Sequence, residues 1–179
     1  MSSICTSAAA LFSSIRLKPK NNPGIGILTG QAGPCMVISD FLKSRGVCLP
    51  ELKEETIRKI QKYLPMSYIK NPVDTTRPGP SFIEILFAIA DDPGIDAIII
   101  FAIHEPAVID PVELFKGIKD RVKKPVLFST AGFPESISPA IDTIKAMGFP
   151  TFTSPDCVAR ATFALVRDSR SMNTLGVKK

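Results

Sequence analysis

The chain of 179 residues is long enough to form one domain with a hydrophobic core. Hydrophobic residues make up 45% and charged residues 22%, and no apolar run approaches the roughly 18 residues that cross a membrane. The net charge of +5 comes without a basic stripe interleaved with aromatic residues, so we expect neither nucleic-acid nor membrane binding. Four cysteines without a CxxC spacing or a nearby histidine partner favour reduced thiols in a cytoplasmic protein and predict no metal site.

The N-terminal segment is rich in serine and alanine, and its apolar residues recur at helical spacing between Ser2 and Ile15. No basic residue precedes its apolar part, which argues against a signal peptide. We therefore predict a short helix followed by a linker, together covering residues 1–21.

The first strand and helix follow this linker. Ile25–Thr29 is a short apolar segment typical of a buried strand. A turn with two glycines leads into a helix that ends near Gly46, with Pro34 in its first turn, where the missing N–H costs nothing. We expect a second strand at residues 47–49 and an amphipathic helix at residues 53–64. Residues 70–80 are too rich in proline for regular structure and predict a long, braced loop.

The second half of the chain alternates helices and strands. Ser81 and Glu84 have the spacing of a capping box for a helix that ends at Ala90. Residues 96–103 are apolar on both faces, which predicts a central parallel strand. The elements expected after it are helices at 111–122, 138–147 and 155–167 and strands at 125–129 and 150–152.

Five strands alternating with helices predict a parallel sheet with right-handed crossovers. The best fit is an α/β, three-layer flavodoxin-like fold with strand order 2-1-3-4-5. This domain is expected to cover residues 22–168, with a disordered tail at 169–179. In such a sheet the ligand crevice lies outside the carboxyl ends of the first and third strands.

The turn after the first strand is the strongest candidate for a phosphate site. It begins a helix, where backbone N–H groups and the helix dipole favour anions. No Gly-Lys-Ser/Thr follows the turn and no GxGxxG is present, so it is neither a Walker A loop nor a dinucleotide fingerprint. The alternative is that its glycines serve only a tight turn. The residues expected to bind phosphate are Gly30, Gln31, Ala32, Gly33 and Cys35.

Two further segments are candidates for the same crevice. His104 is the only histidine and follows the third strand, so it is either a general base or phosphoryl acceptor or an ordinary loop residue. Asn71, Asp74 and Arg77 lie in the proline-rich loop, although Asp74 could simply cap its own turn. No Ser/His/Asp set or carboxylate pair can be assembled, so we assign no catalytic residue.

Six segments follow one another in an order that resembles a known family. They are GIGILTGQAGP, LPELKEETIRKIQKYLP, KNPVDTT, DDPGIDAIII, KPVLFSTAGFPESISPAI and GFPTFTSPDCVARA. The chain resembles, from about residue 22 to 167, the C-terminal flavodoxin-like ligase domain of NDP-forming acyl-CoA synthetases, the group of ADP-forming acetyl-CoA synthetase and succinyl-CoA synthetase. The combination of ELKEET, LP and NPVD is its most specific part.

The resemblance implies a role in making or breaking an acyl-CoA while phosphate is exchanged with ADP or GDP. In this family the phosphohistidine lies in a sister domain, and two helix N-termini point at it. The matching helix here begins at Gly33-Pro34, with Cys35 where the family often has glycine. His104 does not match the family's phosphohistidine, because its neighbours differ.

The family's other parts have no counterpart in the sequence. The implied partners are the CoA-binding, phosphohistidine and ATP-grasp domains of the same enzyme, and CoA and ADP or ATP with magnesium are ligands of that full enzyme. Neither CoA nor ADP or ATP is expected to bind this chain alone. The chain should be inactive by itself. Two other functions remain open: a stand-alone phosphate- or nucleotide-binding module, and a structural interaction module.

Overall fold

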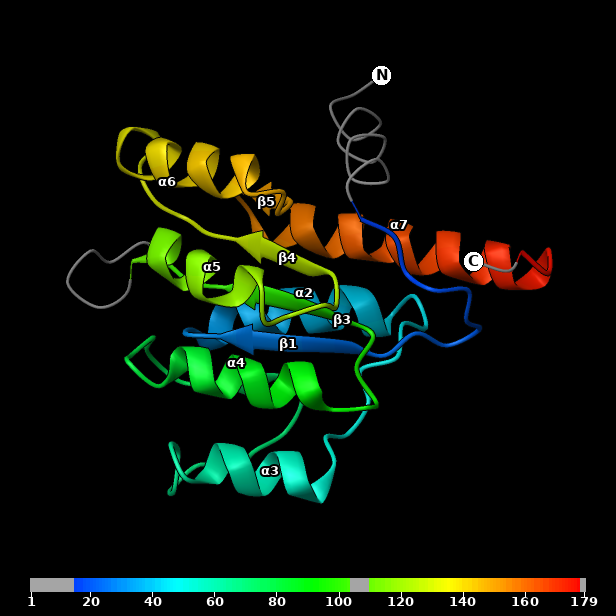
Figure 1. Cartoon of the computed structure of the whole chain (residues 1–179), viewed down its shortest axis with the longest axis horizontal. Coiled ribbons are helices and arrows are strands. Elements are labelled where there is room, and N and C mark those ends of the chain that lie inside the picture. The colour runs from blue at the N-terminus through cyan, green and yellow to red at the C-terminus, as the bar shows by residue number, and fades with distance from the viewer. Residues whose placement is uncertain (1–14, 104–109, 178–179) are drawn as a thin grey trace.

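The computed structural model describes residues 15–103 and 110–177, and its centre is a five-stranded parallel sheet (Figure 1). The strand order is β2-β1-β3-β4-β5, which confirms the predicted flavodoxin-like α/β fold. The strands are β1 (Ile25–Thr29), β2 (Val73–Asp74), β3 (Ala97–Phe101), β4 (Val126–Ser129) and β5 (Thr151–Phe152).

Helices cover both faces of the sheet and make three layers (Figure 1). One face packs against α2 (Ala32–Lys43) and α7 (Pro155–Thr174). The other packs against α4 (Phe82–Asp91), α5 (Pro111–Lys119) and α6 (Pro134–Ala146), with α3 (Glu54–Gln61) lying against α4.

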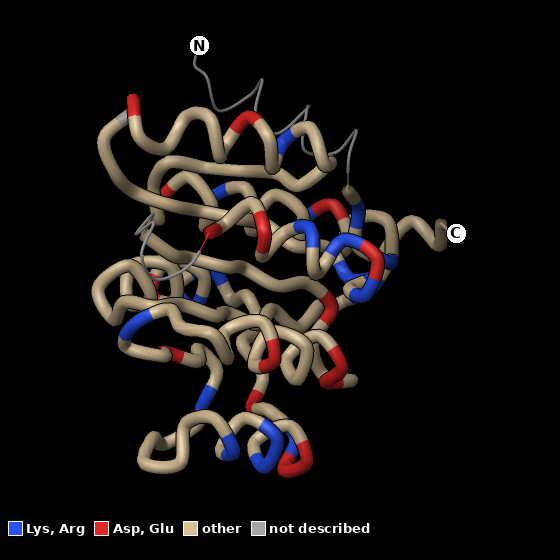
Figure 2. The backbone as a smooth tube through the Cα atoms, turned by 60° about the vertical axis from the view of Figure 1, so that its left-hand side comes forward, with Lys and Arg blue, Asp and Glu red and all other residues tan. Residues whose placement is uncertain are grey.

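The core lies between these layers and the strands. Every residue of β3 is buried, and its side chains alternate between the two cores. Ile98 and Ile100 face α4 and α5, whereas Ile99 faces α2 and α7. Figure 2 shows the charged residues mainly on the helices and loops around the sheet. Asp74 is the one charged residue in the described strands.

The second strand is not where the sequence predicted it. Residues 47–49 make only an isolated bridge, in which Cys48 lies beside Gly24. The strand next to β1 is instead β2, where Val73 pairs with Leu28 and Asp74 with Thr29, inside the segment expected to be an irregular loop. Buried Val73 supplies the apolar contact that sheet pairing needs, and two residues suffice because β2 lies at the sheet edge.

One predicted helix cap and several predicted helix ends also differ from the structure. Ser81 has helical backbone angles and its hydroxyl caps nothing, so the predicted capping box is wrong. Helix α6 begins at Pro134 rather than Ser138, because proline fits the first turn. Helix α7 continues to Thr174, so the disorder predicted after Ser169 is wrong for residues 169–174.

The remaining domain assignments stay predictions. The helix expected over Ser2–Ile15 lies almost wholly outside the described residues. Within the described residues, every helix is too short or too polar to span a membrane.

Candidate functional site

The turn between β1 and α2 lies at the carboxyl edge of the sheet, beside the end of β3. The Gly30 amide donates a hydrogen bond to the Phe101 carbonyl (3.2 Å). The Thr29 hydroxyl accepts from the Gln31 amide (3.0 Å) and donates to the Gln31 carbonyl (2.8 Å). These bonds fix the direction in which α2 leaves the strand.

The two glycines of the turn have different roles. A Cβ on Gly30 would lie 2.3 Å from Cδ of Pro78, so the proline-rich loop packs directly on the Gly30 backbone. A Cβ on Gly33 would meet nothing within 4 Å. Gly30 is therefore required by packing, whereas the space over Gly33 is open.

Fewer backbone N–H groups of this turn are available to bind an anion than the sequence predicted. Gly30 and Gln31 already donate within the protein, and proline at position 34 has no N–H. Cys35 is the fourth residue of α2, so its amide enters the helical ladder. Ala32 and Gly33, the first two residues of the helix, keep N–H groups without an intrahelical partner.

Cys35 lies on the buried side of α2. The residue is 8% exposed. Burial, reinforced by the nearby Asp74 carboxylate, raises the pKa of the Cys35 thiol to about 11 against a smaller opposing influence of Lys43. The thiol is therefore protonated at neutral pH and suited to packing, since the thiolate is the reactive form.

The loop around Asp74 is braced by its own side chains. Oδ1 of Asp74 accepts from the Thr76 amide (2.8 Å), so this carboxylate caps its turn. Thr76 has a φ of +60°, a rare backbone conformation for a β-branched residue. The Thr75 hydroxyl donates to the Arg77 carbonyl (3.0 Å), and Pro78 completes the contact with Gly30.

Asn71 has a structural position outside the crevice. Its Oδ1 accepts from the Ile27 amide (3.0 Å), and its Nδ2 donates to the carbonyls of Ile25 (2.8 Å) and Pro50 (3.0 Å). The side-chain amide thus imitates a strand backbone beside β1. His104, the other predicted site residue, lies outside the described residues.

Within residues 15–103 and 110–177, three buried polar atoms near this edge have no hydrogen-bond partner: Oε1 of Gln31, Oγ of Ser129 and Oγ1 of Thr130. Ser129 and Thr130 were not among the site residues expected from the sequence. Their signal is two hydroxyl residues directly after an apolar strand, at the edge where ligands bind in this kind of sheet.

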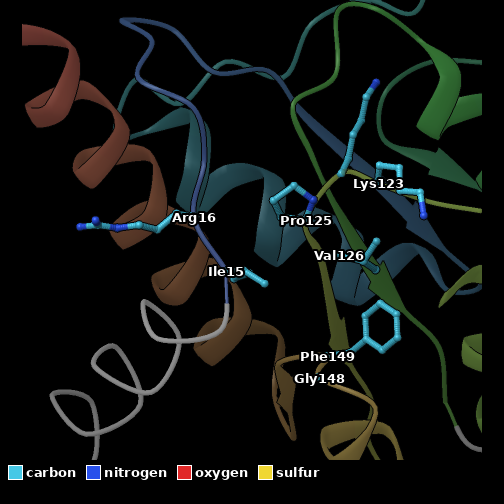
Figure 3. A pocket seen from close by; sticks show the side chains of 8 residues that line it. Ile15, Arg16, Lys123, Pro125, Val126, Gly148 and Phe149 are labelled. Carbon is cyan, nitrogen blue, oxygen red and sulfur yellow. The ribbon is translucent and has the colours of Figure 1, made fainter. Parts of the chain in front are cut away.

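A separate hollow of about 280 Å³ lies at the opposite, amino edge of β4 (Figure 3). Arg16, Lys123 and Lys124 contribute to its lining. Figure 3 shows the Arg16 side chain directed away from Phe149 and Val126, and its guanidinium pairs with Asp168 (3.1 Å). Nζ of Lys124 donates to the Asp92 carbonyl (2.6 Å). Two of its three charged groups therefore already have protein partners.

The described residues contain no group of three or more His, Cys, Asp and Glu side chains that could hold a metal ion. The fold and the turn together define the protein as a flavodoxin-like α/β domain. The N-terminus of its helix α2 is open at the carboxyl edge of the sheet.

Comparison with known proteins gives this domain its relatives. No family model matches the chain. It is 32% identical, over 164 residues, to the alpha subunit of the ADP-forming acetate–CoA ligase II of Pyrococcus furiosus, covering 86% of this chain and 35% of the relative. It is 28% identical over 162 residues to the ADP-forming acetate–CoA ligase I of Archaeoglobus fulgidus, covering 89% of this chain and 23% of that one.

Solved structures agree. The crystal structure of PH0766 from Pyrococcus horikoshii OT3 matches with a TM-score of 0.80 and 31% identity, over 97% of this chain and 40% of that one. The dinucleotide-forming acetyl-coenzyme A synthetase 1 of Ca. Korarchaeum cryptofilum, in complex with phosphate and ADP, matches with a TM-score of 0.81 at 22% identity, over 100% of this chain and 40% of that one. The latter likeness shows the fold alone.

The chain is therefore homologous to part of the ADP-forming acetate–CoA ligases, which confirms the resemblance to NDP-forming acyl-CoA synthetases. It spans 35% of the first relative's length.

Proposed function

We propose that this chain is the ligase domain or subunit of an NDP-forming acyl-CoA synthetase, which interconverts acyl-CoA, ADP and phosphate with acid, CoA and ATP. The observation that carries the proposal is the 32% identity to an acetate–CoA ligase subunit over 86% of the chain. CoA and ADP would bind mainly to the parts of the enzyme that this chain does not match.

The role assigned to this chain is to hold a phosphoryl group carried by a partner domain's histidine. The N–H groups of Ala32 and Gly33 point out of the start of α2, whose first turn contains no acidic residue. A helix N-terminus stabilises a nearby anion by about 0.3 to 2 kcal/mol. The open space over Gly33 leaves room for the phosphoryl group to approach.

This role needs no nucleophile or general base from the chain. Asp74 is committed to its turn and the Cys35 thiol is buried and protonated. The chain would contribute backbone dipoles, and the partner domain the reacting histidine.

Reconstitution tests the proposal. The chain is mixed with polypeptides that supply the CoA-binding, phosphohistidine and ATP-grasp domains, and ATP formation from acetyl-CoA, ADP and phosphate is followed. We expect CoA release and ATP formation to depend on the chain. Equal rates with and without it would contradict the proposal.

A second candidate is a stand-alone phosphate- or nucleotide-binding module. The open amides of Ala32 and Gly33 favour it, because a free anion could reach them without a partner domain. Calorimetry with CoA, ADP, FMN and acetyl phosphate separates the two functions. Binding of one of these to the isolated chain supports the module, and no binding to any of them rejects it.

A further inference from the structure

The outer surface of α2 and α7 carries an aromatic and cationic cluster. These helices pack against each other on one face of the sheet. Phe41 of α2 and Phe163 of α7 are half-buried at their seam, and their rings meet edge to face with centroids 6.5 Å apart.

Three arginines surround these two rings. The Arg45 guanidinium lies 3.6 Å from the Phe41 centroid, and that of Arg160 lies 5.3 Å from it. The Arg167 guanidinium lies 6.0 Å from the Phe163 centroid. We call these five residues the arginine–phenylalanine face.

The positive charge of this face is incompletely neutralised. Arg160 pairs with Asp156 (2.7 Å). Among the residues that the structure describes, Arg45 donates only to the Phe41 carbonyl (3.2 Å) and the Ser44 hydroxyl (3.0 Å). Among the described residues, neither Arg45 nor Arg167 has a carboxylate within ion-pair distance.

Apolar surface continues from this face along α2. Val37 lies one helical turn before Phe41 and is 50% exposed, and its neighbour Met36 is 63% exposed. Arginine, phenylalanine and methionine together form the composition that is enriched in protein interfaces.

We propose that the arginine–phenylalanine face docks an acidic amphipathic helix of a protein partner. A guanidinium held over an aromatic ring can still donate from the N–H groups that the protein does not use, and those groups match carboxylates. Exposed Val37 and Met36 would receive the apolar side chains of the same helix. This inference does not rest on the proposed enzymatic function.

The charge of the arginine–phenylalanine face favours an acidic helix over two other occupants, the N-terminal segment of this chain and a second copy of it. Residues 1–14 contain no acidic side chain, so that segment of the chain does not complement the arginines. A second copy docking through the same face would set Arg45 and Arg167 against the same two residues of the other copy, which electrostatic repulsion opposes.

The test is a titration of the full ¹⁵N-labelled chain with a synthetic helix of about 18 residues, or five turns. The probe has leucine on one face and glutamate on the other, and a matched peptide has lysine in place of glutamate. We expect saturable amide shifts confined to α2, α7 and the adjoining Arg45 with the acidic peptide only, and weaker binding at higher salt.

Charge reversal gives the decisive comparison. The R45E/R167E double variant should bind the acidic peptide at least about tenfold more weakly, whereas R58E in exposed α3 should bind like the wild type. If R45E/R167E does not fold, R45Q/R167Q replaces it with the same expectation. Absent binding, equal binding of the lysine peptide, shifts elsewhere, an unaffected double variant, self-association through this face or tighter binding of a single-stranded oligonucleotide would each overturn the proposal.

Discussion

The two edges of the sheet differ in how they treat polar groups. At the amino edge, a network of side chains is bonded to the backbone. Oδ2 of Asp96 accepts from the Gly24 amide and from Nζ of Lys20, both at 2.7 Å. Asp92 accepts from the amides of Lys53 and Gly94, both at 2.8 Å.

At the carboxyl edge, several polar groups find no partner among the described residues. Oγ of Ser129, Oγ1 of Thr130 and Oε1 of Gln31 are buried there without a hydrogen bond to any described residue, and α2 begins with open amides at Ala32 and Gly33. Buried polar atoms without partners cost stability. The amino edge thus bonds most of its polar side chains into the fold, with Oδ2 of Asp168 as an exception, whereas the carboxyl edge keeps polar groups that the described residues do not use.

The largest expected effect comes from removing a bonded side chain beside β1. N71A should lower the free energy of unfolding by about 3 kcal/mol, because three backbone groups lose their partner. Urea denaturation measures it. The control is N22A at an exposed residue, which should change little; equal stabilities of the two variants would contradict the assigned role of Asn71.

A glycine pair tests the packing at the carboxyl edge. G30A should cost about 1 to 3 kcal/mol, because its Cβ would overlap Pro78. G33A meets open space and should fold with nearly wild-type stability in thermal unfolding. If G33A is the more damaging of the two, the roles assigned to these glycines are wrong.

The Asp92 carboxylate predicts a pH dependence. Burial alone would raise its pKa, but hydrogen bonds from the Lys53 amide, the Thr56 side chain and the Gly94 amide outweigh burial and hold the pKa below its usual range. A lowered folded pKa stabilises the protein above the ordinary value of about 4, and that stability is lost as the pH falls through the folded pKa.

D92N should therefore be less stable than wild type by about 1 to 2 kcal/mol at pH 7, and the difference should shrink in acid. Urea denaturation from neutral to acidic pH checks this. D142N, at an exposed residue, should follow the wild-type curve. A pH-independent difference for D92N would point to lost packing instead of a lost charge.

The smallest expected effect is a gain at Thr76. T76G should raise stability by up to about 1 kcal/mol, because glycine adopts a positive φ without strain. T76A removes the hydroxyl but keeps the strain, so it separates the two contributions in thermal unfolding. Lower stability of T76G than of T76A would show that backbone strain is not the governing term.

The sequence predicted the fold well wherever apolar pattern decides structure. The run at 96–103 gave the central strand β3, and the glycine turn after β1 was placed at the correct edge. It could not place β2, because two residues directly after Pro72 are too few to carry a strand pattern. The extension of α7 had a signal in Ser169 and Met172, which continue the buried stripe of Leu165.

The sequence predicted where the candidate site lies, but not which of its backbone amides are open. Its glycine pattern fits a phosphate turn, but which amides stay open depends on two bonds: the long-range bond from the Gly30 amide to the Phe101 carbonyl, and the local bond from the Gln31 amide to the Thr29 hydroxyl. The contact of Pro78 with Gly30 joins segments far apart in the chain. The orientation of Cys35 was likewise set by packing, since it lies on the buried side of α2.

The most direct test of the central claim removes one open amide without disturbing the helix. In A32P, proline occupies the first position of α2, which it favours, and Gln31 already has extended angles (φ −147°, ψ 133°) that suit a residue before proline. A32S keeps the N–H and is the control. In the reconstituted ATP-forming assay, we predict that A32P folds normally but slows phosphoryl transfer about tenfold or more, while A32S matches wild type. Wild-type rates for A32P would contradict the claim that this helix N-terminus holds the phosphoryl group.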